Sequence, residues 1–296
     1  MKAETWIKRN MPSLVGKTVA VSGATGGLGQ ELCVHLAALG ASLLLLDRNS
    51  ERSCALIERL QARFPSLEAK HLRIDLADFG SVASVTEQLK KNPPDVLILN
   101  AGAYHIPRYV CDTGYDNVFQ INFLSPYYLA SSLLPIMKEK GGRIVAVGSI
   151  AHNYSHADFE DVDFSKRTQS SKVYGNAKRW LMFSLFGLCD NSDSIAVVHP
   201  GITLTNITAH YPKWIYAIIK HPMKVIFMKP KRASLSILYG ITEPCGKNEW
   251  IGPSLFDIWG LPRKKRLKSC SKEEAATIFA RAQSMMEELR TRATRE

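Results

Sequence analysis

The stretch VSGATGGLGQ, residues 21–30, decides the fold because it places a glycine-rich turn between a strand and a helix. A β-branched apolar run precedes it, and a segment with helical periodicity follows it. Gly23 permits a tight turn, while Gly27 and Gly29 let backbone approach a ligand and let the helix pack closely on the sheet. The helix N-terminus then offers unpaired N–H groups to phosphates. The stretch therefore predicts a dinucleotide-binding loop.

Beyond this loop, apolar runs alternate with amphipathic segments along the chain. Such alternation predicts βαβ units, and strands that are apolar throughout are typical of a parallel sheet covered on both faces. We therefore expect an α/β fold, a Rossmann-like doubly wound parallel sheet of about seven strands with helices on both faces. The expected strands are 17–22, 41–47, 68–76, 95–102, 142–149, 194–201 and a short one near 254–259. The expected helices are 30–40, 51–64, 81–91, about 113–140, one that contains 173–187, about 231–241, and 272–290.

Asp47 ends the second expected strand, about 20 residues beyond the glycines. Its carboxylate can accept hydrogen bonds from both adenosine ribose hydroxyls and would repel a 2′-phosphate, which favours NAD. Arg48 beside it could instead clamp a 2′-phosphate, which favours NADP. Because no basic residue lies among Ala24, Thr25 and Gly26, we expect NAD as the cofactor, with NADP left open.

The segment VYGNAKRWLMFSLFG, residues 173–187, is an apolar helical pattern interrupted by Tyr174 and, one turn later on the same face, by Lys178. A free tyrosine has a pKa of about 10 and is a poor base at neutral pH. The Lys178 ammonium beside the phenol should lower the pKa of Tyr174. A lone tyrosine in a helix is usually a packing residue, but behind a nucleotide-binding loop this pair indicates a proton-transfer device.

Together these residues resemble the short-chain dehydrogenase/reductase superfamily. The spacing Gly23-x3-Gly27-x-Gly29 and the YGNAK segment match that family's patterns, although Ser22 stands where the family has a threonine. Further matches follow in the family's order between residues 17 and 205. They are Asp75 and Leu76, the NAG segment Asn100, Ala101 and Gly102, then Asn122, Ser149, and HPGITLT at 199–205. The long interval 150–173 and, more loosely, WIGPSLFDIWG at 250–260 resemble the retinol-dehydrogenase-like branch.

This resemblance implies an NAD(P)-dependent oxidoreductase that transfers a hydride between nicotinamide and an alcohol or carbonyl group. It makes Tyr174 the acid/base, and Lys178 the modulator of its pKa and an anchor of the nicotinamide ribose. Ser149 would orient the substrate oxygen, and Asn122 would support a proton-relay water. The expected cofactor-binding residues are Ser22, Gly23, Thr25, Gly27, Leu28, Gly29, Asp47, Arg48, Asp75, Leu76, Asn100, Ala101, Gly102, Tyr174, Lys178, Pro200, Gly201 and Thr205.

The chain is long enough for one large domain, so we expect a single domain over residues 1–296. Its cofactor-binding and catalytic core would span 17–201, and 231–296 would complete the fold. By the resemblance, 202–230 is a substrate lid segment, and it is apolar, aromatic and flanked by lysines. This composition suits a lipophilic alcohol or carbonyl substrate, such as a retinoid, a steroid or a lipid. It would equally suit peripheral contact with an anionic membrane, which stays open.

The net charge of +11 favours anionic partners. The basic run RKKRLK, 263–268, is interpreted as a solvated loop, and without an aromatic platform or a reading helix it argues against nucleic-acid binding. The six cysteines show neither CxxC nor metal-ligand spacing, so no metal is expected and a reducing compartment is favoured. Neither a signal peptide nor a membrane span is recognisable, so we expect a cytoplasmic protein, with contact at a membrane surface left open.

Two alternatives stay in view. His152, His156 and His199 could be bases, but none has a fixed spacing to the glycine loop, so structural roles are expected. A catalytically silent NAD(P)-binding sensor or scaffold could also keep this fold. The complete set of catalytic residues argues against it, and tight NAD(H) binding without turnover would favour it. Family members often form homodimers or homotetramers through long helices, here about 113–140 and 172–189, which this sequence permits.

Overall fold

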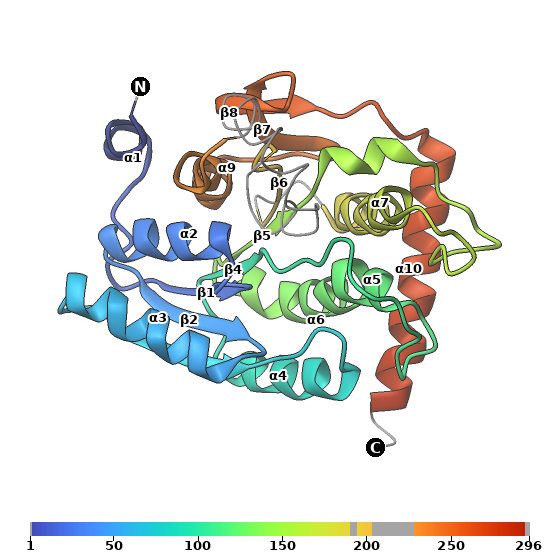
Figure 1. Cartoon of the computed structure of the whole chain (residues 1–296), viewed down its shortest axis with the longest axis horizontal. Coiled ribbons are helices and arrows are strands. Elements are labelled where there is room, and N and C mark those ends of the chain that lie inside the picture. Colours follow the sequence, from blue (N-terminus) through green and yellow to red (C-terminus); the bar gives the residue numbers. More distant parts are fainter. Residues whose placement is uncertain (1, 190–193, 203–227, 294–296) are drawn as a thin grey trace, which may run out of the picture.

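The computed structural model describes residues 2–189, 194–202 and 228–293, and its centre is one eight-stranded sheet (Figure 1). The strand order is β3-β2-β1-β4-β5-β6-β7-β8, and every neighbouring pair from β3 to β7 is parallel. The order reverses at β1, so the crevice beyond the carboxyl ends of β1 and β4 is the expected ligand site. The strands are β1 (Thr18–Ser22), β2 (Ser42–Asp47), β3 (Ala69–Arg73), β4 (Val96–Leu99), β5 (Arg143–Val147), β6 (Ile195–Val198), β7 (Glu249–Leu255) and β8 (Trp259–Arg266).

Helices cover both faces of the sheet, as the continuous apolar strands predict (Figure 1). One core lies between the sheet and α1, α2, α3 and α9, and the other between the sheet and α4, α6, α7 and α10. The predicted doubly wound α/β fold is therefore confirmed. The α-helices are α1 (Ala3–Asn10), α2 (Gly27–Ala38), α3 (Ser50–Arg63), α4 (Phe79–Lys91), α5 (Asn117–Phe119), α6 (Ser125–Glu139), α7 (Ser170–Leu188), α9 (Pro230–Thr242) and α10 (Lys272–Ala293). Two further turns are η1 (Gln120–Leu124), a π-helix, and η2 (Ile150–Tyr154), a 3₁₀-helix.

The interpretation of the basic run as a solvated loop was wrong, because most of it lies in β8. This strand pairs with β7 in antiparallel register, with Trp250 opposite Lys265 and Ile251 opposite Lys264. The Lys265 ammonium donates to the Asp257 carboxylate at 2.8 Å and to the Pro253 carbonyl at 2.7 Å. An edge strand rich in lysine is a common protection against edge-to-edge pairing. The run therefore adds one strand to the roughly seven that the sequence predicts.

Two local features also differ from the expectation. The predicted helix at about 113–140 is α5, η1 and α6 in succession, because the chain widens into a π-turn at 120–124. The short helix α1 was not predicted, and its Trp6 ring packs edge-on against the Tyr239 ring of α9 at 5.6 Å.

Among the described helices, none has both the length and the apolar character needed to cross a bilayer.

Candidate active site

In the glycine loop between β1 and α2, Gly23 and Gly29 have no room for a side chain. Gly23 has a positive φ of 68°, and a Cβ there would lie 2.8 Å from the Cα of Ala101. A Cβ on Gly29 would lie 2.2 Å from the Gly23 carbonyl oxygen. The helix begins at Gly27, and no side chain caps its N-terminus. Since the first N–H groups of a helix lack intrahelical partners, this end of α2 can bind an anion such as a pyrophosphate.

Ser22 and Asn100 join the ends of β1 and β4 beneath this loop. The Ser22 hydroxyl accepts hydrogen bonds from the backbone N–H groups of Asn100 and Ala101, both at 3.1 Å. The Asn100 amide donates to the carbonyls of Ser22 and Gly23, both at 3.0 Å. The Ser22 hydroxyl therefore joins the end of β1 to the end of β4, and the NAG segment fixes the shape of the glycine loop. Sequence reasoning assigned these residues to the cofactor without predicting this role.

Asp47 lies at the carboxyl end of β2 with 6% of its surface exposed. Its Oδ1 accepts hydrogen bonds from the Thr25 hydroxyl at 3.1 Å and the Thr25 N–H at 3.4 Å. Its Oδ2 is buried and has no partner among the described residues. Desolvation raises the pKa of Asp47, and the hydrogen bonds from Thr25 oppose that rise. One carboxylate oxygen is therefore without a hydrogen-bond donor among the described residues. Arg48 beside it is exposed.

Three further residues expected to bind the cofactor have structural contacts. The Asp75 carboxylate accepts from the Ala77 N–H at 3.0 Å, which closes its own turn. The carbonyl of the buried Leu76 accepts from the Ser125 hydroxyl at 2.6 Å, so α6 is tied to the end of β3. Leu28 is half-buried and packs against the core beneath α2.

Tyr174, Lys178 and Ser149 meet beside the end of β5. The Lys178 ammonium donates to the Val147 carbonyl at 2.9 Å and lies 5.9 Å from the centroid of the Tyr174 ring. The Ser149 side chain lies close enough to the Tyr174 phenol for hydrogen bonding to lower the pKa of Tyr174. The structure thus brings together three of the four residues that the sequence predicts to be catalytic, and α7 carries two of them one helical turn apart.

The electrostatics of this group differ from the expectation that Lys178 lowers the pKa of Tyr174. Desolvation raises the pKa of Tyr174 to about 12, and the hydrogen bond with Ser149 opposes that rise. Burial also lowers the pKa of Lys178 to about 8. Both ionised forms are therefore disfavoured in the protein by itself, because low polarity disfavours charge on either residue.

Asn122 lies in the π-turn η1 and is fully buried. Its Oδ1 accepts from the Ala103 N–H at 3.1 Å, and its Nδ2 donates to the carbonyls of Ala103 and Val118 at 2.8 Å each. A Cβ on Gly102 would lie 2.9 Å from this Oδ1 and 3.6 Å from the Lys178 ammonium. The Asn122 side chain therefore holds the loop after β4 closely against Lys178. Its predicted support of a relay water stays a prediction.

The segment after β6 lies against the turn between β7 and β8. Pro200 is buried, and Gly201 has a positive φ of 85°, with the Ile258 carbonyl oxygen 2.8 Å from where a Cβ would stand. This contact sets β6 against the turn between β7 and β8. Thr205 and most of the expected lid, 203–227, lie outside the described residues.

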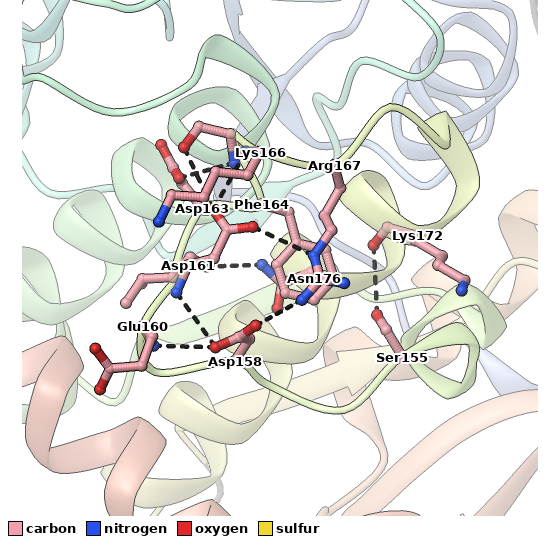
Figure 2. A network of polar contacts seen from close by, with 12 residues as sticks. Ser155, Asp158, Glu160, Asp161, Asp163, Phe164, Lys166, Arg167, Lys172 and Asn176 are labelled. Carbon is pink, nitrogen blue, oxygen red and sulfur yellow. Dashed lines mark hydrogen bonds and ion pairs between the residues drawn. The ribbon is translucent and has the colours of Figure 1, made fainter.

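The interval 150–173 forms an ordered wall next to α7 (Figure 2). Arg167 donates to Asp158 at 2.6 Å and to Asp161 at 3.3 Å, which closes the loop on itself. The Asn176 amide of α7 donates to the Val162 carbonyl at 2.7 Å. Asp163 accepts from the Asp116 N–H at 2.8 Å, so the loop is also fixed to the segment before α5.

This wall is apolar where it faces Tyr174. Phe164 is buried in a small cluster with Val118 and Val173, and Ile106 and Tyr174 pack against it. The Tyr104 ring meets the Tyr174 ring edge-on at 5.3 Å. Sequence reasoning missed Phe164 and Tyr104 as neighbours of Tyr174. Nothing in their local pattern marks them, because the contact depends on how the long interval folds back.

The three histidines have structural surroundings. His152 and His199 are buried, and His156 pairs with Glu274 at 3.6 Å. The His199 ring stacks on Trp250 at 5.2 Å, and desolvation lowers the pKa of His199 to about 3. The neutral state that this implies does not suit a base, which must be able to hold a proton.

Residues 17–168 match the family model described as short chain dehydrogenase. The chain belongs to the short-chain dehydrogenase family. This short-chain dehydrogenase is 31% identical to retinol dehydrogenase 14 of Mus musculus, over 66% of its own length and 64% of that protein's. It is 25% identical to polyprenol dehydrogenase of Homo sapiens, over 79% of its own length and 74% of that protein's.

A solved short-chain dehydrogenase from Sphingobium yanoikuyae, in complex with NADPH, matches the short-chain dehydrogenase described here with a TM-score of 0.58. The two are 26% identical, and the match covers 76% of this chain and 83% of that chain. The predicted family, its retinol-dehydrogenase-like branch and the enzyme class are thereby confirmed. The chain is an NAD(P)-dependent oxidoreductase.

Proposed function

We propose that this short-chain dehydrogenase interconverts a lipophilic alcohol and its carbonyl compound, with Tyr174 as the acid/base. The observation that carries the proposal is the Tyr174 phenol, which lies within reach of the Ser149 hydroxyl and beside the buried Lys178. An acid/base must be within hydrogen-bonding reach of the reacting oxygen, and a hydroxyl within reach of Tyr174 can hold that oxygen in place.

In the oxidation direction, Tyr174 takes the proton of the alcohol, and in reduction it returns one to the carbonyl oxygen. When bound, the nicotinamide accepts or supplies the hydride. The Ser149 hydroxyl orients the substrate oxygen toward the phenol. The Lys178 ammonium, when protonated, favours the phenolate because an opposite charge stabilises the ionised form. Asn122 keeps the neighbouring loop in position.

The residues around the glycine loop fit a dinucleotide. Gly23 and Gly29 keep the backbone of the loop bare at two positions, the N-terminus of α2 has no side-chain cap, and Asp47 Oδ2 is a buried acceptor with no partner among the described residues. A ribose hydroxyl would supply the missing donor, whereas a 2′-phosphate would bring a second negative charge. We therefore propose NAD as the preferred cofactor. NADPH, which the Sphingobium relative binds, is the alternative that a titration must include.

The apolar cluster of Phe164, Val118 and Val173, with Ile106 packed against it, supports a lipophilic substrate. The names of two relatives, a retinol dehydrogenase and a polyprenol dehydrogenase, agree with that class. We further propose that 17–201 is the cofactor-binding and catalytic core, that 202–230 is the lid, and that 231–296 completes the single domain. Membrane contact and homo-oligomer formation stay predictions.

A chain-length series of primary alcohols, with retinol as one member, tests the substrate class. Burial of one CH₂ contributes about 0.8 kcal/mol, so kcat/KM with NAD⁺ should rise about fourfold for each added CH₂ until the pocket is filled. The matched control is the same series with Tyr109→Phe, since Tyr109 is 53% exposed. A kcat/KM that stays flat or falls with chain length would contradict the lipophilic substrate. Tight NADH binding without turnover of any member would support a silent sensor instead.

A further inference from the structure

His152 lies three residues beyond Ser149, in η2, and is fully buried. Its Nδ1 contacts the Ser149 carbonyl oxygen at 2.7 Å, and its Nε2 contacts the Ser269 hydroxyl at 2.7 Å. A carbonyl oxygen can only accept, so Nδ1 carries the proton and Nε2 accepts from Ser269. Both ring nitrogens are therefore satisfied in one neutral tautomer. Desolvation lowers the pKa of His152, which agrees with that state.

Arg179 holds the same two residues from the catalytic helix. It follows Lys178 directly and has a side chain only 1% exposed. Its guanidinium donates to the His152 carbonyl at 3.1 Å and to the Ser269 carbonyl at 2.8 Å. Two further bonds, at 2.7 and 2.6 Å, go to the two carboxylate oxygens of Glu274 on α10. A bidentate pair of this kind fixes orientation as well as charge.

These contacts converge on the Ser149 backbone. Its carbonyl accepts twice, from the His152 ring at 2.7 Å and from the His152 N–H at 3.1 Å. The Ser149 hydroxyl, on the same residue, is the group within reach of the Tyr174 phenol. A rotation of the Ser149 peptide would move that hydroxyl, and a misplacement of about 1 Å can cost about a hundredfold in rate.

We propose that His152 is a positioning residue that sets the Ser149 hydroxyl against Tyr174, and that Arg179 and Glu274 fix His152 from α7 and α10. This inference rests on the proposed function, because it assumes that Ser149 orients the substrate. It gives the C-terminal helix a part in catalysis although that helix supplies no group to the reaction.

Two substitutions of His152 separate positioning from packing. In His152→Asn, the amide nitrogen stands as many bonds from Cα as Nδ1 does and can still donate to the Ser149 carbonyl. In His152→Gln, the amide stands at the position of Nε2 and can bond only to Ser269. Both variants lose the ring, so a packing loss is common to them. We expect kcat to fall about 10- to 100-fold in His152→Gln and to be recovered to within about fivefold of wild type in His152→Asn.

The pH profile gives a second measurement that a structural role would not change. The Ser149 hydrogen bond lowers the pKa of Tyr174, so its loss should move the rise of kcat/KM for alcohol oxidation to higher pH. We expect this alkaline shift in His152→Gln and not in His152→Asn, with the Kd for NADH unchanged in both. If either His152 variant fails to fold, Ser269→Ala keeps the ring and removes one partner. It should give a smaller alkaline shift of the same sign.

Equal kcat values and equal pH profiles in the two His152 variants would overturn the inference, as would a Ser269→Ala profile identical to wild type. Ser149→Ala in the same assay distinguishes a failure of the positioning inference from a failure of the proposed function. If Ser149→Ala loses turnover while the His152 variants behave alike, the positioning inference fails and the proposed function stands. If wild type turns over and Ser149→Ala is equally active, the assumed role of Ser149 fails, and the inference with it.

Discussion

Replacement of Asp47 tests how the protein chooses its nicotinamide cofactor. Its Oδ2 is buried and has no partner among the described residues, while Oδ1 is held by Thr25. A hydrogen bond to a charged group contributes about 1.5–3 kcal/mol, so Asp47→Ala should weaken NADH binding roughly 10- to 100-fold. A 2′-phosphate about 4 Å from the carboxylate would be repelled by about 4 kcal/mol at an effective dielectric constant of about 20.

Removing that repulsion should tighten NADPH binding, by at most about a thousandfold, since every 1.4 kcal/mol is a factor of ten. The assay is a titration that follows nicotinamide fluorescence. Asp47→Asn is the matched variant, because it keeps the side-chain shape and removes only the charge. Asp47→Asn should lose less NADH affinity than Asp47→Ala loses. Its gain in NADPH affinity should match that of Asp47→Ala. A wild-type preference for NADPH, or an NADH affinity unchanged in Asp47→Ala, would refute this reasoning and assign the selection to Arg48.

Three further perturbations follow from contacts in the structure. Although desolvation raises the pKa of Glu274, its hydrogen bonds with Arg179 and neighbours outweigh that effect and lower the pKa to about 2. Its stabilising contribution is therefore present above the unfolded pKa of about 4.5 and lost as pH falls toward 2. Glu274→Gln should flatten the fall of the unfolding free energy over that range in urea titrations, and an unchanged slope would contradict the pairing. Gly29→Ala should cost about 1–3 kcal/mol in the same titrations and abolish NADH binding, because its Cβ would meet the Gly23 carbonyl at 2.2 Å. Phe164→Ala should reduce the gain of kcat/KM with alcohol chain length and leave kcat/KM for short alcohols unaffected. Equal effects on short and long alcohols would argue against contact between Phe164 and the substrate.

The sequence predicted those parts of the site whose signal is local. The glycines at 23, 27 and 29 and the pair Tyr174 and Lys178 each lie within one strand–helix junction or one helical turn, so their spacing carries their geometry. Ser149 was predicted from the order of the family's short motifs, and in the structure its side chain lies near the Tyr174 phenol. The parallel sheet with helices on both faces followed from the alternation of apolar runs and amphipathic segments.

What the sequence could not give depends on contacts between distant segments. The bonds from Arg179 to Glu274 and from His152 to Ser269 join residues far apart in the chain, and no local pattern marks them. The basic run was misinterpreted because its pairing with β7 and the partners of its lysines, such as Asp257 for Lys265, are set by the folded chain and not by the local charge pattern. The pKa of Tyr174 likewise depends chiefly on burial, which cannot be estimated from a four-residue spacing.

The central claim is that Tyr174 moves the proton while hydride passes to the cofactor. The most direct measurement is deuterium transfer from a C1-deuterated long-chain alcohol to NAD⁺, followed by mass spectrometry in wild type and Tyr174→Phe. The account predicts deuterated cofactor from wild type and a transfer at least about 100-fold slower from Tyr174→Phe, with an unchanged Kd for NADH. Transfer at the wild-type rate in Tyr174→Phe would contradict it.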